Sequence, residues 1–199
     1  MSTRTSQDEL DSAVLELLPL QGGWDEDEYL WLTDHTTRLF ELTDGHIEVL
    51  PMPTDEHQGI SGFCYLALTL YLQSRGGVVR YSPLRLRLRP RKFREPDLLV
   101  LRDARDPRRE NRYWHGADLV LEIVSPDKPE RDLVEKRRDY AEAGIPEYWI
   151  VNPLNETIGV LALHEGDYRE HGLFGRGERA VSALLPGFAV SVDEVFASR

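Results

Sequence analysis

Cysteine and long apolar runs are nearly absent from this chain. Cys64 is the single cysteine among 199 residues, which excludes an internal disulfide framework and indicates a reducing compartment. No apolar run approaches the ~20 residues that a membrane-spanning helix needs. The first ten residues are polar and lack the apolar core of a signal peptide. We therefore expect a cytoplasmic protein that does not interact with membranes.

Several common catalytic patterns are also missing. The six histidines do not have the spacing of a zinc site. The chain contains no Ser-centred nucleophile elbow, no phosphate-cradling glycine loop and no dinucleotide fingerprint. Lysine is scarce as well, with three lysines against 21 arginines. These absences argue against zinc enzymes, serine hydrolases and the common nucleotide-binding folds.

The length and the turn signals indicate one folded domain. A chain of this size can bury roughly 70% of its unfolded surface without disulfides or metals to staple it. We expect residues 1–23 to form a partly ordered tail, which Gly22-Gly23 ends. Residues 24–199 then form a single domain, without an internal repeat or a clear linker.

Hydrophobic periodicity predicts a mixture of helices and strands. Thr43-Asp44-Gly45 is a strong turn signal between two short strands, so we expect an N-terminal hairpin. The expected helices cover residues 25–32, 56–73 and 129–143, and the expected strands cover 38–42, 46–50, 78–89, 96–102, 117–124, 145–151, 156–163, 167–172 and 187–190. This order favours an α/β fold, with a mixed sheet packed against helices.

Charge is distributed unevenly along the chain. The net charge is -11, yet residues 75–112 contain 13 Arg and Lys against 5 Asp and Glu, a local charge of +8. Such a basic segment can form the electrostatic footprint of a nucleic-acid backbone. The alternative is a solvated strand face, because arginine alternates with leucine there. The candidate DNA-binding residues are Arg85, Arg87, Arg89, Arg91, Lys92 and Arg94.

Two carboxylates lie in strongly apolar strands. Glu122 is inside the run 119–124, which reads as a strand buried on both faces. Asp97 is at the mouth of the apolar strand that precedes it. A buried carboxylate is costly unless it is paired, protonated or bound to a metal. If both acids point to the same sheet edge, they form an oxygen-rich site that suits Mg²⁺.

Lys136 is the candidate cation for such a site. It lies on the expected helix that follows the Glu122 strand, and lysine is the rarer cation in this chain. Helical spacing leaves open whether Lys136 or Arg137 points at the carboxylates. The alternative is a surface lysine paired with Asp132, four residues earlier.

Four blocks of the sequence form a combined motif: FELTDG at 40–45, EPDLLV at 95–100, ADLVLEIVSP at 117–126 and RDLVEKRRDYAEAGIPEYWIV at 131–151. Together these blocks resemble the Uma-two family of restriction-endonuclease-like proteins, a part of the PD-(D/E)XK nuclease superfamily. The resemblance covers roughly residues 24–172, and its joint spacing is specific. The resemblance implies a restriction-endonuclease-like mixed central sheet flanked by helices, with an N-terminal hairpin and a C-terminal strand-rich extension.

The resemblance also implies roles for individual residues. Asp97 and Glu122 match the metal-binding acids of the superfamily, and the backbone carbonyl of Ile123 would be a further ligand. The motif's lysine is expected two residues after Glu122, but Val124 occupies that position. The lysine function is implied to have moved to Lys136.

An additional upstream metal ligand is usual in the superfamily. Glu41 and Glu48 are the first candidates and His57 comes after them, and the sequence does not choose among them. His46 occupies a position where the family pattern has an acid. A homodimer is expected from the resemblance and from the need of duplex cleavage for two active sites.

Three functions follow from these observations. The first is a Mg²⁺-dependent endonuclease, with Mn²⁺ as a substitute, that hydrolyses DNA phosphodiester bonds. The second is a catalytically inactive DNA-binding or assembly module of the same fold, which the valine at position 124 favours. The third is a glycosidase with two catalytic carboxylates. The third leaves Lys136 without a role, and the tryptophans do not cluster as a sugar platform.

Overall fold

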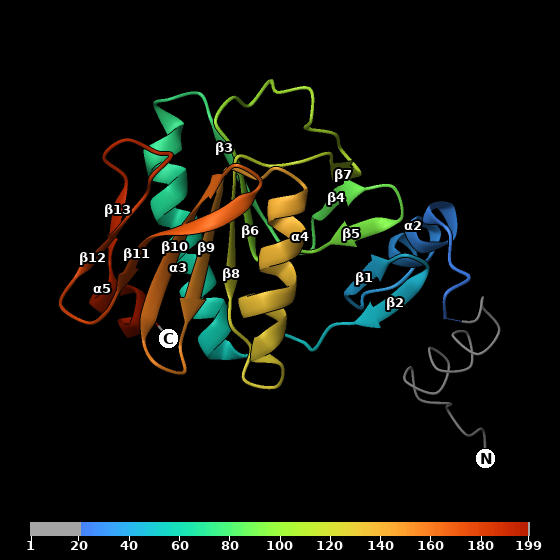
Figure 1. Cartoon of the computed structure of the whole chain (residues 1–199), viewed down its shortest axis with the longest axis horizontal. Coiled ribbons are helices and arrows are strands. Elements are labelled where there is room, and N and C mark those ends of the chain that lie inside the picture. The colour runs from blue at the N-terminus through green and yellow to red at the C-terminus, as the bar shows by residue number, and fades with distance from the viewer. Residues whose placement is uncertain (1–20, 199) are drawn as a thin grey trace, which may run out of the picture.

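The computed structural model describes residues 21–198, and within them the strands form three sheets. β8 and β9 of the largest sheet are parallel, whereas its other neighbouring strands are antiparallel. In spatial order, this sheet contains β11 (Asp167–Phe174), β10 (Thr157–His164), β9 (Glu147–Asn152), β8 (Leu119–Ile123), β6 (Leu98–Leu101) and β3 (Val78–Tyr81). The predicted mixed α/β architecture is confirmed (Figure 1).

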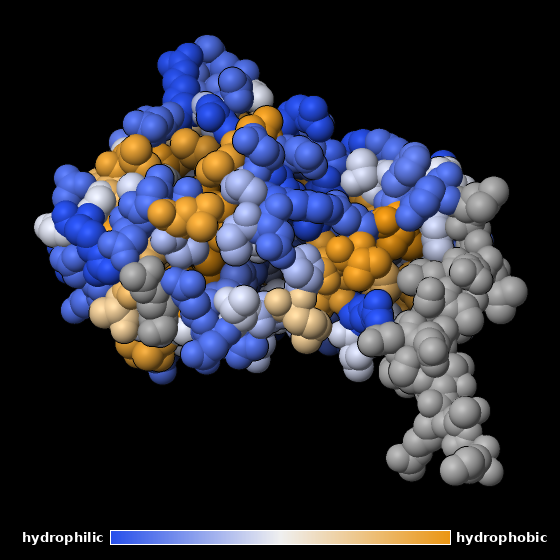
Figure 2. Space-filling model, turned by 90° about the horizontal axis from the view of Figure 1, so that it is seen from below, coloured by the Kyte–Doolittle hydropathy of each residue, from blue (hydrophilic) through white to orange (hydrophobic). Residues whose placement is uncertain are grey.

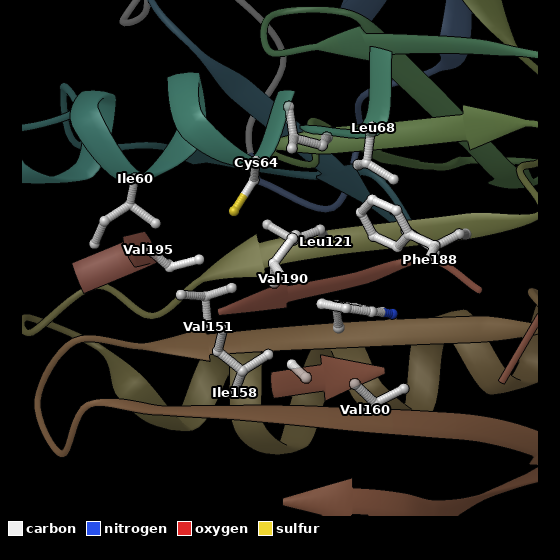
Figure 3. Close-up of a cluster of buried hydrophobic side chains, with 14 of the residues drawn as sticks. Ile60, Cys64, Leu68, Leu121, Val151, Ile158, Val160, Phe188, Val190 and Val195 are labelled. Atoms are coloured by element: carbon white, nitrogen blue, oxygen red, sulfur yellow. The ribbon is translucent and has the colours of Figure 1, made fainter. Parts of the chain in front are cut away.

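Helix α3 (Asp55–Gln73) covers one face of the largest sheet. Thr54 caps its N-terminus, where the hydroxyl accepts a hydrogen bond from the His57 N–H. Figure 3 shows Cys64 and Leu68 of this helix above Leu121 of β8. The cap and the apolar stripe fix the helix against the sheet, and its first turn lies next to the end of β6.

Strand β8 is buried on both faces, as its continuous apolar run predicts. Leu121 and Ile123 belong to the apolar cluster that contains α3. Val120 and Val124 belong to the cluster that contains α4 (Lys136–Glu142), on the opposite face. Because side chains alternate along a strand, Glu122 faces α4.

The second sheet carries the N-terminal hairpin. In spatial order it contains β2 (His46–Val49), β1 (Phe40–Thr43), β5 (Lys92–Arg94), β4 (Arg85–Arg89) and β7 (Tyr113–Trp114). The hairpin turn at Asp44-Gly45 has positive φ values of 49° and 84°, which suit these two residue types. Helix α2 (Glu26–Asp34) packs on the hairpin, and Tyr29 shares a buried cluster with Phe40 and Phe93.

The C-terminal part closes the α3 side of the molecule. β12 (Arg179–Val181) pairs with β13 (Ala189–Ser191), and α5 (Val192–Ala197) follows. Phe188 and Phe196 from this part join the α3 cluster. The sequence predicts a strand near β13, but it does not predict β12 or α5.

Two predicted elements differ from the structure. Residues 78–89 form two strands, β3 and β4, because Pro83 lacks an N–H and interrupts the strand, and the two strands belong to different sheets. The expected helix 129–143 begins with a π-helical turn, η1 (Arg131–Glu135), before α4. Gly144, with φ +73°, follows the end of α4 as expected. β5 and β7 are short strands that the periodicity does not reveal.

The predicted tail lies outside the described residues except for positions 21–23. Gln21 exchanges hydrogen bonds of 2.9 and 2.8 Å with the backbone of Ile47 in β2. The described chain therefore begins attached to the hairpin. None of the helices in the described part of the chain is long and apolar enough to cross a membrane.

Candidate active site

Asp97 and Glu122 come together at the ends of two neighbouring strands. β6 and β8 pair with Leu98 opposite Leu121, and continuing this register places Asp97 beside Glu122. Asp97 Oδ2 accepts a hydrogen bond of 2.7 Å from the backbone N–H of Ile123. This bond fixes the Asp97 carboxylate at the end of β8, where Glu122 also lies.

Glu122 is held by two side chains of α4. Its Oε1 lies 2.8 Å from Lys136 Nζ and accepts a hydrogen bond of 2.5 Å from the Tyr140 hydroxyl. Lys136 and Tyr140 are four residues apart and so share one side of the helix. Arg137 instead donates a hydrogen bond of 2.8 Å to the Tyr168 carbonyl. The helix therefore presents Lys136, and not Arg137, to the acids.

Besides Glu122, Lys136 binds the carboxylate of Asp132, which is the third acid at the site. The Lys136 side chain is 7% exposed, and its Nζ lies 3.1 Å from Asp132 Oδ1. Asp132 belongs to η1, where the N–H of Lys136 donates to the Arg131 carbonyl five residues earlier. Such π turns are rare and are frequent at functional sites. The i, i+4 pair noted in the sequence exists, but it is buried at the site and is not a surface ion pair.

A cleft of about 1070 Å³ is lined by Asp97, Glu122, Asp132 and Lys136. His57, in the first turn of α3, lines it as well, with Nε2 3.2 Å from Asp97 Oδ2. Of the three candidates for an additional ligand, the structure places His57 in the cleft. Glu41 and Glu48 lie outside its lining.

Burial and neighbouring charges shift the protonation of the site. Burial raises the pKa of Glu122 to about 8, and Asp97 and Asp132 act in the same direction while Lys136 opposes them. Burial alone would lower the pKa of Lys136, but the surrounding carboxylates, Glu122 first, raise it overall. Burial alone would lower the pKa of His57, but the hydrogen bond to Asp97 and the negative charges of the surrounding carboxylates together raise it. Lys136 therefore stays charged near neutral pH, whereas the carboxyl group of Glu122 takes up a proton more readily than a free glutamate does.

Glu41 of β1 is enclosed by cations. Its Oε2 lies 2.9 Å from Arg131 and 3.2 Å from Arg94, and its Oε1 lies 3.8 Å from Lys136. Oε1 also accepts a hydrogen bond of 3.1 Å from the Glu95 N–H. Burial alone would raise the pKa of Glu41, but Lys136, Arg94 and Arg131 lower it to about 2. In this conformation Glu41 supports the cations around the site.

We expect Glu41 to make the stability of the fold sensitive to acid. Its pKa is lower in the folded chain, so the ionised carboxylate stabilises the fold above about pH 4.5 and loses this effect as pH falls toward 2. The contribution at pH 7 is at most about 3 kcal/mol. Urea unfolding of wild type and Glu41→Gln in EDTA, at pH 7 and at pH 3, measures it. The free-energy difference between the two proteins should shrink at the lower pH; an equal difference would contradict the assignment.

Three residues at the site carry no role in the predictions from sequence. Tyr140 receives no role there, although it lies four positions after Lys136 on the expected helix. Asp132 is expected only as the partner of a surface lysine. Glu95 lines the cleft, and burial and the charge of Glu41 raise its pKa to about 8. Its position directly before Pro96-Asp97 is the sequence feature that could have identified Glu95 as a residue of the site.

The basic segment 75–112 is engaged in internal ion pairs. Lys92 and Arg94 are 4% and 7% exposed, and both bind the buried Asp139. Their burial is incompatible with the predicted contact to a DNA backbone. The other four candidate side chains pair with the N-terminal part of the chain: Arg85 with Asp34, Arg87 with Glu26, Arg89 with Asp44, and Arg91 with the carbonyl of Trp24.

The carboxylates of the cleft have free oxygens that fit a hard cation. Asp97 Oδ1 and Glu122 Oε2 make no hydrogen bond with the described residues. Within residues 21–198, no group of three or more His, Cys, Asp or Glu side chains is positioned to hold a metal ion. Two carboxylates suffice for Mg²⁺, which keeps several waters, whereas a structural zinc site needs four protein ligands. The donor set therefore fits Mg²⁺ or Mn²⁺.

Comparison with known proteins extends these findings. Residues 26–193 match the Uma2 family, described as "Putative restriction endonuclease". A crystal structure described as a putative nuclease belonging to DUF820, from Anabaena variabilis, superposes with a TM-score of 0.71 at 22% sequence identity. The match covers 90% of this chain and 99% of that one. This likeness shows a shared fold. No curated protein matches the chain significantly.

Proposed function

Because the chain belongs to the Uma2 family of restriction-endonuclease-like proteins, we propose that it is a metal-dependent endonuclease that hydrolyses DNA phosphodiester bonds. The observation that carries the proposal is the convergence of Asp97, Glu122 and Lys136 in one cleft. Two acids come from adjacent strands, and the cation comes from the helix that packs over them. This constellation suits phosphoryl transfer to water.

Each residue has a distinct role in this proposal. Asp97 and Glu122, with the backbone carbonyl of Ile123, would hold Mg²⁺ or Mn²⁺. When bound, such an ion lowers the pKa of a coordinated water and neutralises charge on a phosphate oxygen. Lys136 holds the Glu122 carboxylate in place and supplies a fixed positive charge at the acids. The N–H of Ile123 orients Asp97.

Lys136→Ala should lower cleavage by about 10²–10³-fold, the usual effect of removing one fixed electrostatic group. Because Lys136 is buried among carboxylates, thermal melting of Lys136→Ala is measured first to establish that the variant is folded. The assay compares linear, supercoiled and single-stranded DNA in Mg²⁺, Mn²⁺ or EDTA. Arg137→Ala is the matched control, since Arg137 is the next cation on the helix and binds Tyr168 instead.

The outcomes of this assay separate two ideas. Metal-dependent cleavage that Lys136→Ala loses and Arg137→Ala keeps supports both the activity and the role of Lys136. Cleavage that survives in Lys136→Ala retains the nuclease and removes the lysine from its mechanism. Absence of cleavage with every substrate and metal would overturn the proposal.

The second candidate is a catalytically inactive DNA-binding or assembly module. Two observations favour it: Val124 occupies the position of the motif's lysine, and the described residues contain no three-ligand metal group. Titration calorimetry distinguishes the two functions. Binding of Mg²⁺ or Mn²⁺ that Glu122→Gln abolishes would support the nuclease, and the absence of metal binding would support the module.

A further inference from the structure

We propose that the cleft binds DNA through unpaired bases, which stack on Tyr81 and an adjoining apolar wall. This inference rests on the proposed function and names the form of its substrate. The cleft has two chemically different sides. One carries the acids with Lys136, and the other is built from aromatic, aliphatic and proline side chains.

The apolar wall is continuous with the acid pair. Its residues come from the hairpin, the loop that leads into α3, α3 itself and the end of β3. They include Val49, Pro51, Met52, Tyr65, Tyr81 and Pro83. Figure 2 shows the molecule from below, with one apolar patch toward the hairpin end of this face and others at the opposite end. An apolar wall in the same cleft as the acids is suited to the faces of bases or sugars.

Tyr81 has the exposure and support of a stacking platform. It is 54% exposed, and its ring makes a T-shaped contact with Tyr65, with ring centroids 5.0 Å apart and planes at 86°. This neighbour supports the ring, and the exposure of Tyr81 leaves part of its surface accessible in the cleft. Aromatic side chains of this kind bind successive bases of single strands with little sequence preference.

The position of Tyr81 relative to Asp97 is fixed by the backbone. Tyr81 pairs with Leu98 at the end of β3, and the next N–H, that of Ser82, donates a hydrogen bond of 3.1 Å to the Asp97 carbonyl. The platform and the acid are therefore built on two hydrogen-bonded strands. A base stacked on Tyr81 would place its own backbone phosphates near the acids.

The electrostatics of the cleft oppose binding that relies on phosphates. Its lining includes the acids Glu56, Glu95, Asp97, Glu122, Asp127 and Asp132 against the cations Lys128, Arg131 and Lys136. Each of these cations already binds a carboxylate, in turn Glu48, Glu41 and Glu122. Duplex DNA presents mainly phosphates and sugar at its surface, and its affinity depends on free cations. Stacking of unpaired bases is the interaction that this cleft offers instead.

Fluorescence anisotropy with labelled oligonucleotides of about 12 nucleotides tests the inference, a length that single-strand sites cover. The measurement uses EDTA to prevent cleavage, and it compares a single strand, its duplex and an abasic strand with the same phosphates. The single strand should bind about tenfold or more tightly than the other two. Affinity for it should fall only shallowly with salt, because few phosphates are neutralised.

Variants of Tyr81 identify the platform. Tyr81→Ala should weaken single-strand binding by about 5- to 100-fold, the range for one base stacked on an aromatic ring, whereas Tyr81→Phe should retain it. Trp31→Ala is the matched control, because Trp31 is 52% exposed on α2 and lies outside the cleft lining. Equal binding of the abasic and normal strands, or unchanged binding by Tyr81→Ala, would overturn the inference.

The same variants separate this inference from the proposed function. Metal-dependent cleavage of duplex DNA that Tyr81→Ala leaves unchanged would refute base stacking and retain the nuclease. Absence of both binding and cleavage with all DNA forms would refute both. Sedimentation velocity tests whether a second copy of the chain binds the apolar wall instead of DNA. If Tyr81→Ala dissociates a dimer but binds the single strand normally, the wall is an interface between copies and the inference fails.

Discussion

Replacing Asp97 with asparagine is expected to lower metal-dependent DNA cleavage by about 10³-fold or more. A bound divalent cation supplies several kcal/mol of transition-state stabilisation in this chemistry, and each 1.36 kcal/mol is about tenfold in rate. The asparagine removes a charge from a two-carboxylate site that holds few other protein ligands. Its side-chain oxygen can still accept the hydrogen bond from the Ile123 N–H. The loss should therefore be chemical rather than structural.

Two further measurements on Asp97→Asn and a control variant make this prediction specific. Calorimetry should show weakened Mg²⁺ and Mn²⁺ binding, and thermal melting should match wild type. Asp103→Asn is the control, because Asp103 follows the same strand but is exposed, and its carboxylate binds Arg105. Undiminished metal-dependent cleavage by Asp97→Asn would remove Asp97 from the mechanism.

Replacing Asp139 with asparagine is expected to lower the free energy of unfolding by about 3–5 kcal/mol, the usual cost of removing one partner from a buried ion pair. The Asp139 side chain is 0% exposed, and Nη2 of Arg94 lies 2.5 Å from its Oδ2. Lys92 binds the other carboxylate oxygen. The substitution leaves two buried cations without their shared counter-charge. Urea unfolding at neutral pH measures the effect.

Asp34→Asn provides the matched control for that substitution. Asp34 also binds two arginines, Arg85 and Arg112, but at the surface, where its side chain is 35% exposed. Exposed ion pairs contribute about 0–1 kcal/mol. Equal destabilisation by the two variants would show that burial of Asp139 does not amplify its ion pairs.

The acid pair could be predicted from the sequence because its signal is local. An uninterrupted apolar run identifies β8 as a buried strand, and a carboxylate within it demands an explanation. The apolar run after Asp97 does the same for β6, and antiparallel neighbours bring the two acids together. The helix after β8 offers two candidate cations, Lys136 and Arg137. The sequence does not decide which of them points at the acids, because the π-helical turn η1 before that helix has no clear sequence signature.

The fate of the basic segment could not be predicted, because the partners are distant. Lys92 and Asp139 are 47 residues apart, and Arg87 and Glu26 are 61 apart. Arginine alternating with leucine indicates a strand with one polar face, and it does not say what packs on that face. The separation of β3 from β4 into different sheets is likewise decided by long-range pairing.

The position of Glu41 bears on what constitutes the smallest working version of this protein. Asp97, Glu122 and Lys136 all follow residue 95, so a motif search would treat the hairpin as dispensable. Yet one carboxylate from β1, that of Glu41, forms ion pairs with Arg94, Arg131 and Lys136. The hairpin therefore supplies a negative charge that holds three cations of the site together. In evolution or in engineering, its sequence can drift only as far as that single negative charge is kept in place.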